Sequence, residues 1–119
     1  KKGELGTKEL NQLLQSTVNP ASEEKKEKKF GDSIFREGDR VMQIKNNYEM
    51  YWERHNPIFE TGSGIFNGEI GTIIGISEVE KQIEIKFDDD KTAWYDFQDL
   101  DQIEHSYVVT IHKAQRKRI

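Results

Sequence analysis

Val41-Met42-Gln43-Ile44-Lys45-Asn46-Asn47-Tyr48 and Ile65-Phe66-Asn67-Gly68-Glu69-Ile70-Gly71-Thr72-Ile73-Ile74 are the two stretches that decide the fold. Each is rich in β-branched and apolar residues, which favour strands. Asn67-Gly68 predicts a tight turn, because Gly, and to a lesser degree Asn, adopts a positive φ at little cost. Gly71 inside the second strand predicts a bulge or a close backbone approach. An ordinary β-hairpin would carry the same residues, so this pattern alone indicates no function.

Further strands are predicted on both sides of these stretches. Gly38-Asp39 is typical of a turn that enters a strand, here over Asp39–Asn46, with the Asp able to accept hydrogen bonds from turn amides. Gln82–Asp88 alternates apolar and charged residues, the pattern of a strand with one buried face. Strands are also expected over Thr92–Phe97 and Tyr107–Ile111. The predicted core residues are Val41, Ile44, Ile73, Ile85 and Phe87.

Tyr48–Gly64 interrupts the strand pattern and is expected to form a long loop. It holds the aromatic residues Tyr48, Tyr51, Trp52 and Phe59. These rings could stack on nucleic-acid bases, or they could pin the loop to the wall of the barrel. Packing is the favoured interpretation, because few basic residues flank the rings.

The segment before the barrel is predicted to be a separate flank, residues 1–29. Thr7–Gln15 reads as a short helix, with Thr7 as its N-cap and a stripe of leucines that would pack on a domain outside this chain. Ser22–Lys29 reads as a charged, solvated linker. A single short helix is marginal in water, so residues 1–29 are expected to be disordered in the isolated chain.

Composition indicates a small domain. Only 34% of the 119 residues are hydrophobic and the mean hydropathy is −0.87, so the core must be small. The chain has no cysteine and no apolar run long enough to span a bilayer, so a cytoplasmic monomer without membrane contact is expected. Because the sequence starts at Lys1 without an initiator Met, a piece of a longer protein is also expected.

Charge is distributed unevenly along the chain. Residues 30–115 carry 17 acidic and 8 basic side chains, whereas the two ends carry 10 basic and 5 acidic ones. An acidic segment is a poor counter-charge for phosphates, so any contact with nucleic acid must be local.

Motifs of catalysis are absent from the sequence. There is no phosphate-binding GxxxxGK[ST] loop, so the chain cannot hydrolyse ATP alone, and neither GxSxG nor HExxH occurs. His55, His105 and His112 have no metal-ligand spacing, and Asp88-Asp89-Asp90 is more typical of a hairpin turn than of a calcium loop. We therefore assign no catalytic residue, no metal ligand and no cofactor to the chain itself.

Three collinear stretches resemble one family. Gly6-Thr7, Leu10-Asn11, Leu14-Gln15 and Val18-Asn19-Pro20 are similar to the G-x-x-x-LN-x-x-LQ-x-x-LNP segment of RecD-like superfamily 1 DNA helicases. Val41-Met42-Gln43, Asn46-Asn47-Tyr48 and Phe66-Asn67-Gly68-Glu69-Ile70-Gly71 resemble the VMQ-x-x-NNY and FNGD-x-G segments of that family. Tyr107–Gln115 resembles its TIHKAQ motif.

The resemblance implies the SH3-like barrel that is inserted in the second motor domain of an ATP-dependent 5′-to-3′ DNA helicase of repair and recombination. The fold class expected is all-β, with a five-stranded SH3-like barrel over residues 30–111. ATP and Mg would bind to the parent motor. Single-stranded DNA and other domains of the motor would be the partners. By the motif match, Thr110, His112 and Lys113 would face DNA, and Asn47 and Tyr48 are weaker candidates.

One departure from the family pattern lies at the end of the chain. Arg116-Lys117-Arg118-Ile119 stands where the motif normally continues Gly-Ser-Glu, so residues 112–119 read as a truncated motif with a basic tail. A second interpretation stays open, in which the barrel is a non-enzymatic adaptor that binds protein or RNA, as small SH3-like barrels often do.

Overall fold

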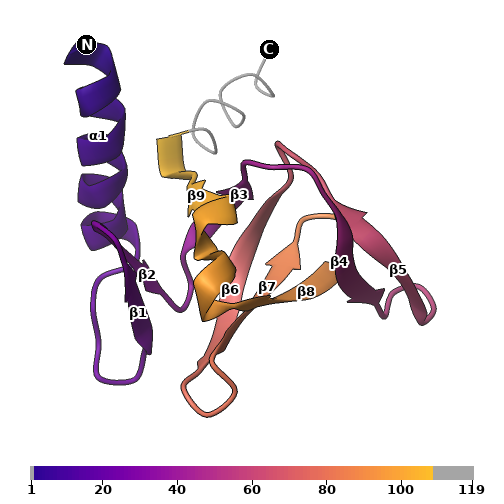
Figure 1. Cartoon of the computed structure of the whole chain (residues 1–119). Helices are drawn as coiled ribbons and strands as arrows, with labels where there is room; N and C mark the ends of the chain where they lie inside the picture. Colours follow the sequence, from indigo (N-terminus) through magenta and orange to yellow (C-terminus); the bar gives the residue numbers. More distant parts are fainter. Residues whose placement is uncertain (1, 109–119) are drawn as a thin grey trace.

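An antiparallel sheet is the central element of the fold (Figure 1). The structure is a computed structural model that describes residues 2–108, with side chains described from residue 9 onward. A helix, α1 (Lys2–Val18), precedes the strands and a 3-10 helix, η1 (Phe97–Gln102), lies near their end. The strands of the described residues are β1 (Glu27–Phe30), β2 (Ser33–Arg36), β3 (Arg40–Gln43), β4 (Asn47–Arg54), β5 (Glu60–Ile65), β6 (Ile70–Ser77), β7 (Gln82–Phe87), β8 (Lys91–Asp96) and β9 (Ile103–His105).

The sheet has the strand order β5-β4-β8-β7-β6-β3-β9, and β1 and β2 form a separate hairpin. The predicted all-β class is confirmed. The predicted count of five strands is wrong, and within residues 2–108 no pairing between β5 and β9 closes the sheet into a barrel. The stretches 41–48 and 65–74 do pair, through β3 and β6, with Val41 opposite Gly71.

The two glycines singled out in these stretches have the predicted roles. Gly68 has a φ of +100°, in a turn closed by a hydrogen bond of 3.1 Å from the Glu69 amide to the Phe66 carbonyl. A Cβ at Gly71 would lie 2.7 Å from the Lys86 carbonyl oxygen, so the close backbone approach is confirmed. Any larger residue at 71 would push β6 and β7 apart.

The expected long loop over 48–64 is instead a hairpin of β4 and β5, with Trp52 opposite Gly62. The two glycines of Thr61-Gly62-Ser63-Gly64 favour a loop in this sequence, because glycine is depleted in strands. The glycine has a packing reason here, since a Cβ at Gly62 would lie 2.5 Å from the Trp52 ring. The indole therefore takes the space that a side chain would need.

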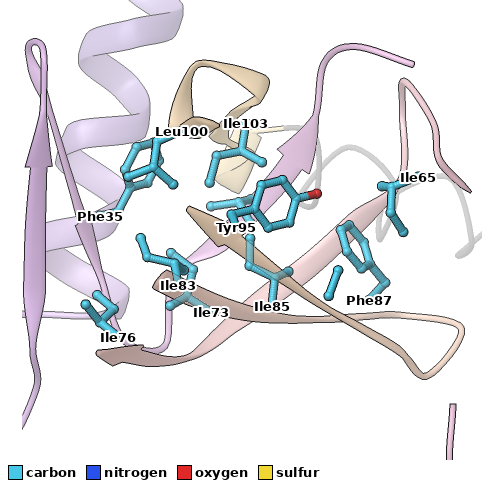
Figure 2. Close-up of a cluster of buried hydrophobic side chains, with 12 residues drawn as sticks. Phe35, Ile65, Ile73, Ile76, Ile83, Ile85, Phe87, Tyr95, Leu100 and Ile103 are labelled. Atoms are coloured by element: carbon cyan, nitrogen blue, oxygen red, sulfur yellow. The ribbon is translucent and has the colours of Figure 1, made fainter. Parts of the chain in front are cut away.

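The core lies between the strands and η1 (Figure 2). Predicted core residues Val41, Ile73, Ile85 and Phe87 are buried, whereas Ile44 is only half-buried because β3 ends before it. The remaining members come from β2, from η1 and from five strands of the sheet: Phe35, Ile65, Ile76, Ile83, Ala93, Tyr95, Leu100 and Ile103.

Three expectations about the flanks were wrong. Helix α1 begins at Lys2, so Thr7 lies inside it and is no N-cap. Glu27–Lys29 of the expected linker belongs to β1, where Glu27 Oε2 forms an ion pair with Arg36 Nε at 2.6 Å. Tyr107 and Val108 are helical rather than extended, and the rest of the strand expected over Tyr107–Ile111 lies outside the described residues.

Among residues 2–108, no helix has the length and apolar character that crossing a membrane would require.

We expect Phe87→Ala to lower the free energy of unfolding by ~3–5 kcal/mol, because the substitution leaves a cavity in the core. Urea unfolding of the purified chain measures this loss. Phe59→Ala is the matched control: that ring is 59% exposed, and its removal should change stability by no more than ~0.5 kcal/mol. Equal effects of the two substitutions would contradict the core assignment.

Candidate functional site

A buried carboxylate joins the two ends of the described chain. Asp39 follows the turn at Gly38 and is completely buried. Its Oδ2 accepts a hydrogen bond of 2.8 Å from the Arg36 amide. The sequence predicted that this Asp would accept from a turn amide. Four side chains surround the same carboxylate, with contacts of 2.7–2.9 Å, and with Asp39 they are called the Asp39 junction here: Gln15, Asn19, His105 and Tyr107.

Helix α1 contributes to the Asp39 junction through amides spaced four residues apart. This spacing places Asn11, Gln15 and Asn19 on one face of the helix. Asn11 donates from Nδ2 to the His105 carbonyl at 3.3 Å and accepts from the Val108 amide at 3.1 Å. The face of α1 that meets the sheet is therefore polar.

The leucine stripe of α1 behaves differently from the sequence expectation. Leu10 and Leu13 are 45% and 61% exposed and do not pack on the sheet. Gln15 and Asn19, by contrast, are buried. The prediction of a helix in this region is right, but it missed that the amides rather than the leucines hold the helix to the rest of the chain.

The electrostatics of the Asp39 junction favour an ionised carboxylate. Burial alone would raise the pKa of Asp39. Hydrogen bonds from His105, Tyr107 and Asn19 and the charge of His105 lower this pKa by more than burial raises it, so the net shift is downward. Burial and the bond to Asp39 raise the pKa of Tyr107, which keeps its hydroxyl a donor. His105 is also fixed by its neighbours, because its ring lies 4.8 Å from the ring of Phe35.

A second polar network lies below the VMQ and NNY stretches. The Gln43 side chain is completely buried, accepts a 2.6 Å hydrogen bond from the Tyr95 hydroxyl and donates to Gln102 at 3.0 Å. Asn47 also donates to Gln102 at 3.0 Å, and its Oδ1 accepts from the Glu49 amide at 3.1 Å. Both ends of the Asn47 amide are therefore used to shape the turn into β4.

Tyr48 presents an aromatic surface beside this network. Its side chain is 69% exposed, and its ring meets the Phe66 ring edge-on with 5.3 Å between centroids. The adjacent hollow of about 260 Å³ includes Lys45, which is paired with Asp101 at 2.9 Å. An exposed ring that is supported from one side can stack on a base. We call Tyr48 and Phe66 the aromatic step.

The predicted site residues differ in where they lie in the structure. Asn47 and Tyr48 are adjacent, with the first inside the network and the second on the surface. Thr110, His112 and Lys113 lie outside the described residues. Sequence reasoning missed Gln15, Asn19, Gln43 and His105, although the four-residue spacing of amides in α1 could have indicated a polar docking face. Among the described residues, no group of His, Asp and Glu side chains could hold a metal ion.

The fold and these networks define a small antiparallel β domain whose ends are tied together at a buried carboxylate. Residues 10–87 match the family of the ATP-dependent RecD-like DNA helicase SH3 domain, and the chain belongs to this family. It is 32% identical to an uncharacterized protein of Methanocaldococcus jannaschii, over 96% of this chain and 10% of that protein. The chain thus spans about a tenth of the length of this relative. No solved structure matches.

We expect Asp39→Asn to lower the free energy of unfolding by at least ~3 kcal/mol at pH 7, since two or more bonds to a charged acceptor of ~1.5–3 kcal/mol each are weakened. Because the pKa of Asp39 is lowered on folding, its ionisation stabilises the native state above the ordinary pKa of Asp, and that stability is lost as the pH falls through the folded value. The variant should therefore lose less stability than the parent chain on acidification below pH ~4. Urea unfolding at a series of pH values measures both effects.

Asp101→Asn is the control for this experiment, because that carboxylate is about half exposed and pairs with Lys45. It should change stability by no more than ~1 kcal/mol. A pH dependence of Asp39→Asn identical to that of the parent chain would contradict the assignment of an ionised Asp39.

Proposed function

We propose that this chain is the accessory SH3-like domain, with its flanks, of a 5′-to-3′ ATP-dependent DNA helicase, and that it braces single-stranded DNA during unwinding. Membership of the RecD-like helicase SH3 family supports the kind of protein. In this proposal ATP and Mg bind to the motor of the parent protein, and the chain itself supplies neither a catalytic residue nor a cofactor site.

The observation that carries the proposal is the contact between the entering and the leaving segment. Asn11 of α1 is bonded to the backbone of both His105 and Val108, more than ninety residues later. A domain inserted into another domain needs its two ends close together. The Asp39 junction provides such a closed base, so the sheet can project from a motor domain without separating the two halves of that domain.

The proposed DNA-facing residues lie close to that base in sequence. Thr110 follows Val108 by two residues, and His112 and Lys113 come next. In our proposal Thr110 donates to a phosphate, and His112 and Lys113 contact the strand when the motor closes on it. The aromatic step offers a second, stacking contact through Tyr48, while Asn47 keeps the step in place.

Charge argues for a brace rather than an autonomous DNA-binding module. Phosphate contacts supply most of the non-specific affinity for nucleic acid, and each needs a local cation. Residues 30–115 carry 17 acidic against 8 basic side chains, and near the aromatic step Lys45 is already paired with Asp101. The motor domains must therefore provide most of the grip on DNA.

We expect the isolated chain to bind a labelled single-stranded oligonucleotide no more tightly than ~10⁻⁴ M at physiological salt. Fluorescence anisotropy measures the affinity, and NMR shift mapping locates the contact. Deleting Arg116–Ile119 or changing Lys113→Ala should weaken this binding further, whereas Trp52→Ala should leave it unchanged. Micromolar binding that survives the deletion and is abolished by Trp52→Ala would overturn the brace.

Tyr48→Ala tests the aromatic step, with Tyr51→Ala as a matched control on the same strand. Removal of a stacking ring costs ~1–3 kcal/mol per base, so Tyr48→Ala should lower the affinity at least about fivefold. Tyr51→Ala removes an exposed ring at 48% exposure and should have no such effect. The assignment to a helicase is tested separately: the gene around this sequence should encode a GxxxxGK[ST] loop upstream.

A further inference from the structure

The outer face of the sheet carries a groove that the proposed DNA contacts do not use. Two surface hollows of about 430 Å³ and 200 Å³ share Glu80, Gln82 and Trp94 in their walls. Because they share these walls, they form one continuous groove across β4, β8, β7 and β6. We call it the outer groove.

One wall of the outer groove is a pair of stacked aromatic rings. Trp52 pairs with Ala93, so the neighbouring Tyr51 and Trp94 face each other across β4 and β8 on the outer side. Their ring centroids are 6.3 Å apart and their planes differ by 21°. Tyr51 is 48% exposed, and both rings line the groove.

The floor continues from the rings onto β7 and β6. Glu84 pairs with Trp94 on one side and with Gly75 on the other. A Cβ at Gly75 would meet nothing closer than 3.6 Å, so the missing side chain leaves open space next to the Glu84 carboxylate. The groove is therefore aromatic at one end and open and acidic at the other.

Carboxylates dominate the polar lining of the outer groove. Glu37, Glu53, Glu80 and Glu84 line it, and among the described residues no basic side chain does. Among the described side chains, the carboxylates of Glu80 and Glu84 make no hydrogen bond or ion pair, while Glu53 accepts from Tyr51 and contacts His55. Lys86, on the same face, is within 3.6 Å of Asp90.

Two other aromatic rings of the molecule have cationic side chains over their faces. Lys91 and Arg54 lie over the Trp52 ring at 5.5 and 5.1 Å, and Lys28 lies over the Phe97 ring at 4.5 Å. Among the described side chains none of these cations lies over Tyr51 or Trp94. A ring face flanked by free carboxylates attracts a cation from outside the domain.

We propose that the outer groove binds an arginine-bearing peptide segment of a protein partner, with a guanidinium stacked on Trp94 and Tyr51 and paired with Glu84 or Glu80. Arginine fits better than lysine, because its planar group stacks on aromatic faces and donates to a carboxylate in a fixed fork. Nucleic acid is disfavoured here, since four carboxylates repel phosphates and no basic residue of the described chain lines the groove. The inference does not depend on the helicase assignment.

The test uses the complete chain and a short peptide of alternating arginine and glycine. Binding is followed by the shift of the Trp94 indole N–H in ¹⁵N NMR spectra, with the same peptide carrying citrulline in place of arginine as the neutral control. We expect the arginine peptide alone to move this signal. Glu84→Gln should weaken binding about fivefold, as the loss of one unit charge at contact distance in water predicts.

Glu104→Gln is the matched control, because it changes the net charge equally on β9, at the opposite end of the sheet order from β4 and β5. It should change the affinity less than about twofold. Trp94→Leu should abolish the peptide-induced shift of the Tyr51 ring signals, and an unchanged melting temperature shows that the variant is folded. Equal binding of the citrulline peptide, equal effects of Glu84→Gln and Glu104→Gln, or preferential binding of oligothymidylate to the Trp94 surface would each overturn the proposal.

Discussion

The structure depends on one buried negative charge. An ionised carboxylate is tolerated inside a protein only when donors replace the water that it loses. Asp39 has one donor in its own turn. The others come from Gln15 of α1, from Asn19 directly after that helix, from His105 at the end of β9 and from Tyr107. The sheet therefore cannot satisfy its own turn without both flanks. Helix, sheet and C-terminal segment are held in one arrangement because a single carboxylate needs all three.

This requirement explains where sequence reasoning succeeded and where it failed. The β3, β6, β7 and β8 strands were predictable because their apolar residues alternate and because Asn67-Gly68 fixes a turn locally. The β4–β5 hairpin was not, since Gly62 is explained only by the Trp52 ring and Gly64 only by the Phe66 ring and its own positive φ. Helix α1 shows the same limit: leucines suggested the buried face, but the contact is made by Gln15 and Asn19 with a carboxylate twenty or more residues away. Long-range polar pairing leaves no apolar periodicity in a sequence, and its trace here is the four-residue spacing of Asn11, Gln15 and Asn19.

The candidate site was partly visible for a related reason. Tyr48 could be selected by its place in a motif, and the structure shows it exposed on the surface. Nothing in the sequence indicated that Asn47 is consumed by bonds to Gln102 and the Glu49 backbone, because those partners come from the fold. In the Gln43 network both ends of the Gln43 amide have a specific partner, including the Tyr95 hydroxyl. Such a network fixes the backbone next to Tyr48, whose ring packs on Phe66.

Two surfaces of opposite character follow from the same sheet. The aromatic step lies beside a lysine at the turn into β4, whereas the outer groove places its rings among free carboxylates. Aromatic residues alone do not distinguish a nucleic-acid surface from a peptide surface, because every base and every guanidinium can stack on a ring. The charge around the ring decides between them, since a phosphate backbone accompanies each base and a positive charge accompanies each arginine. By this criterion Tyr51 and Trp94 do not suit the DNA strand that we propose for Tyr48. In our two proposals the sheet faces DNA with one edge and a protein partner with the outer side of its strands.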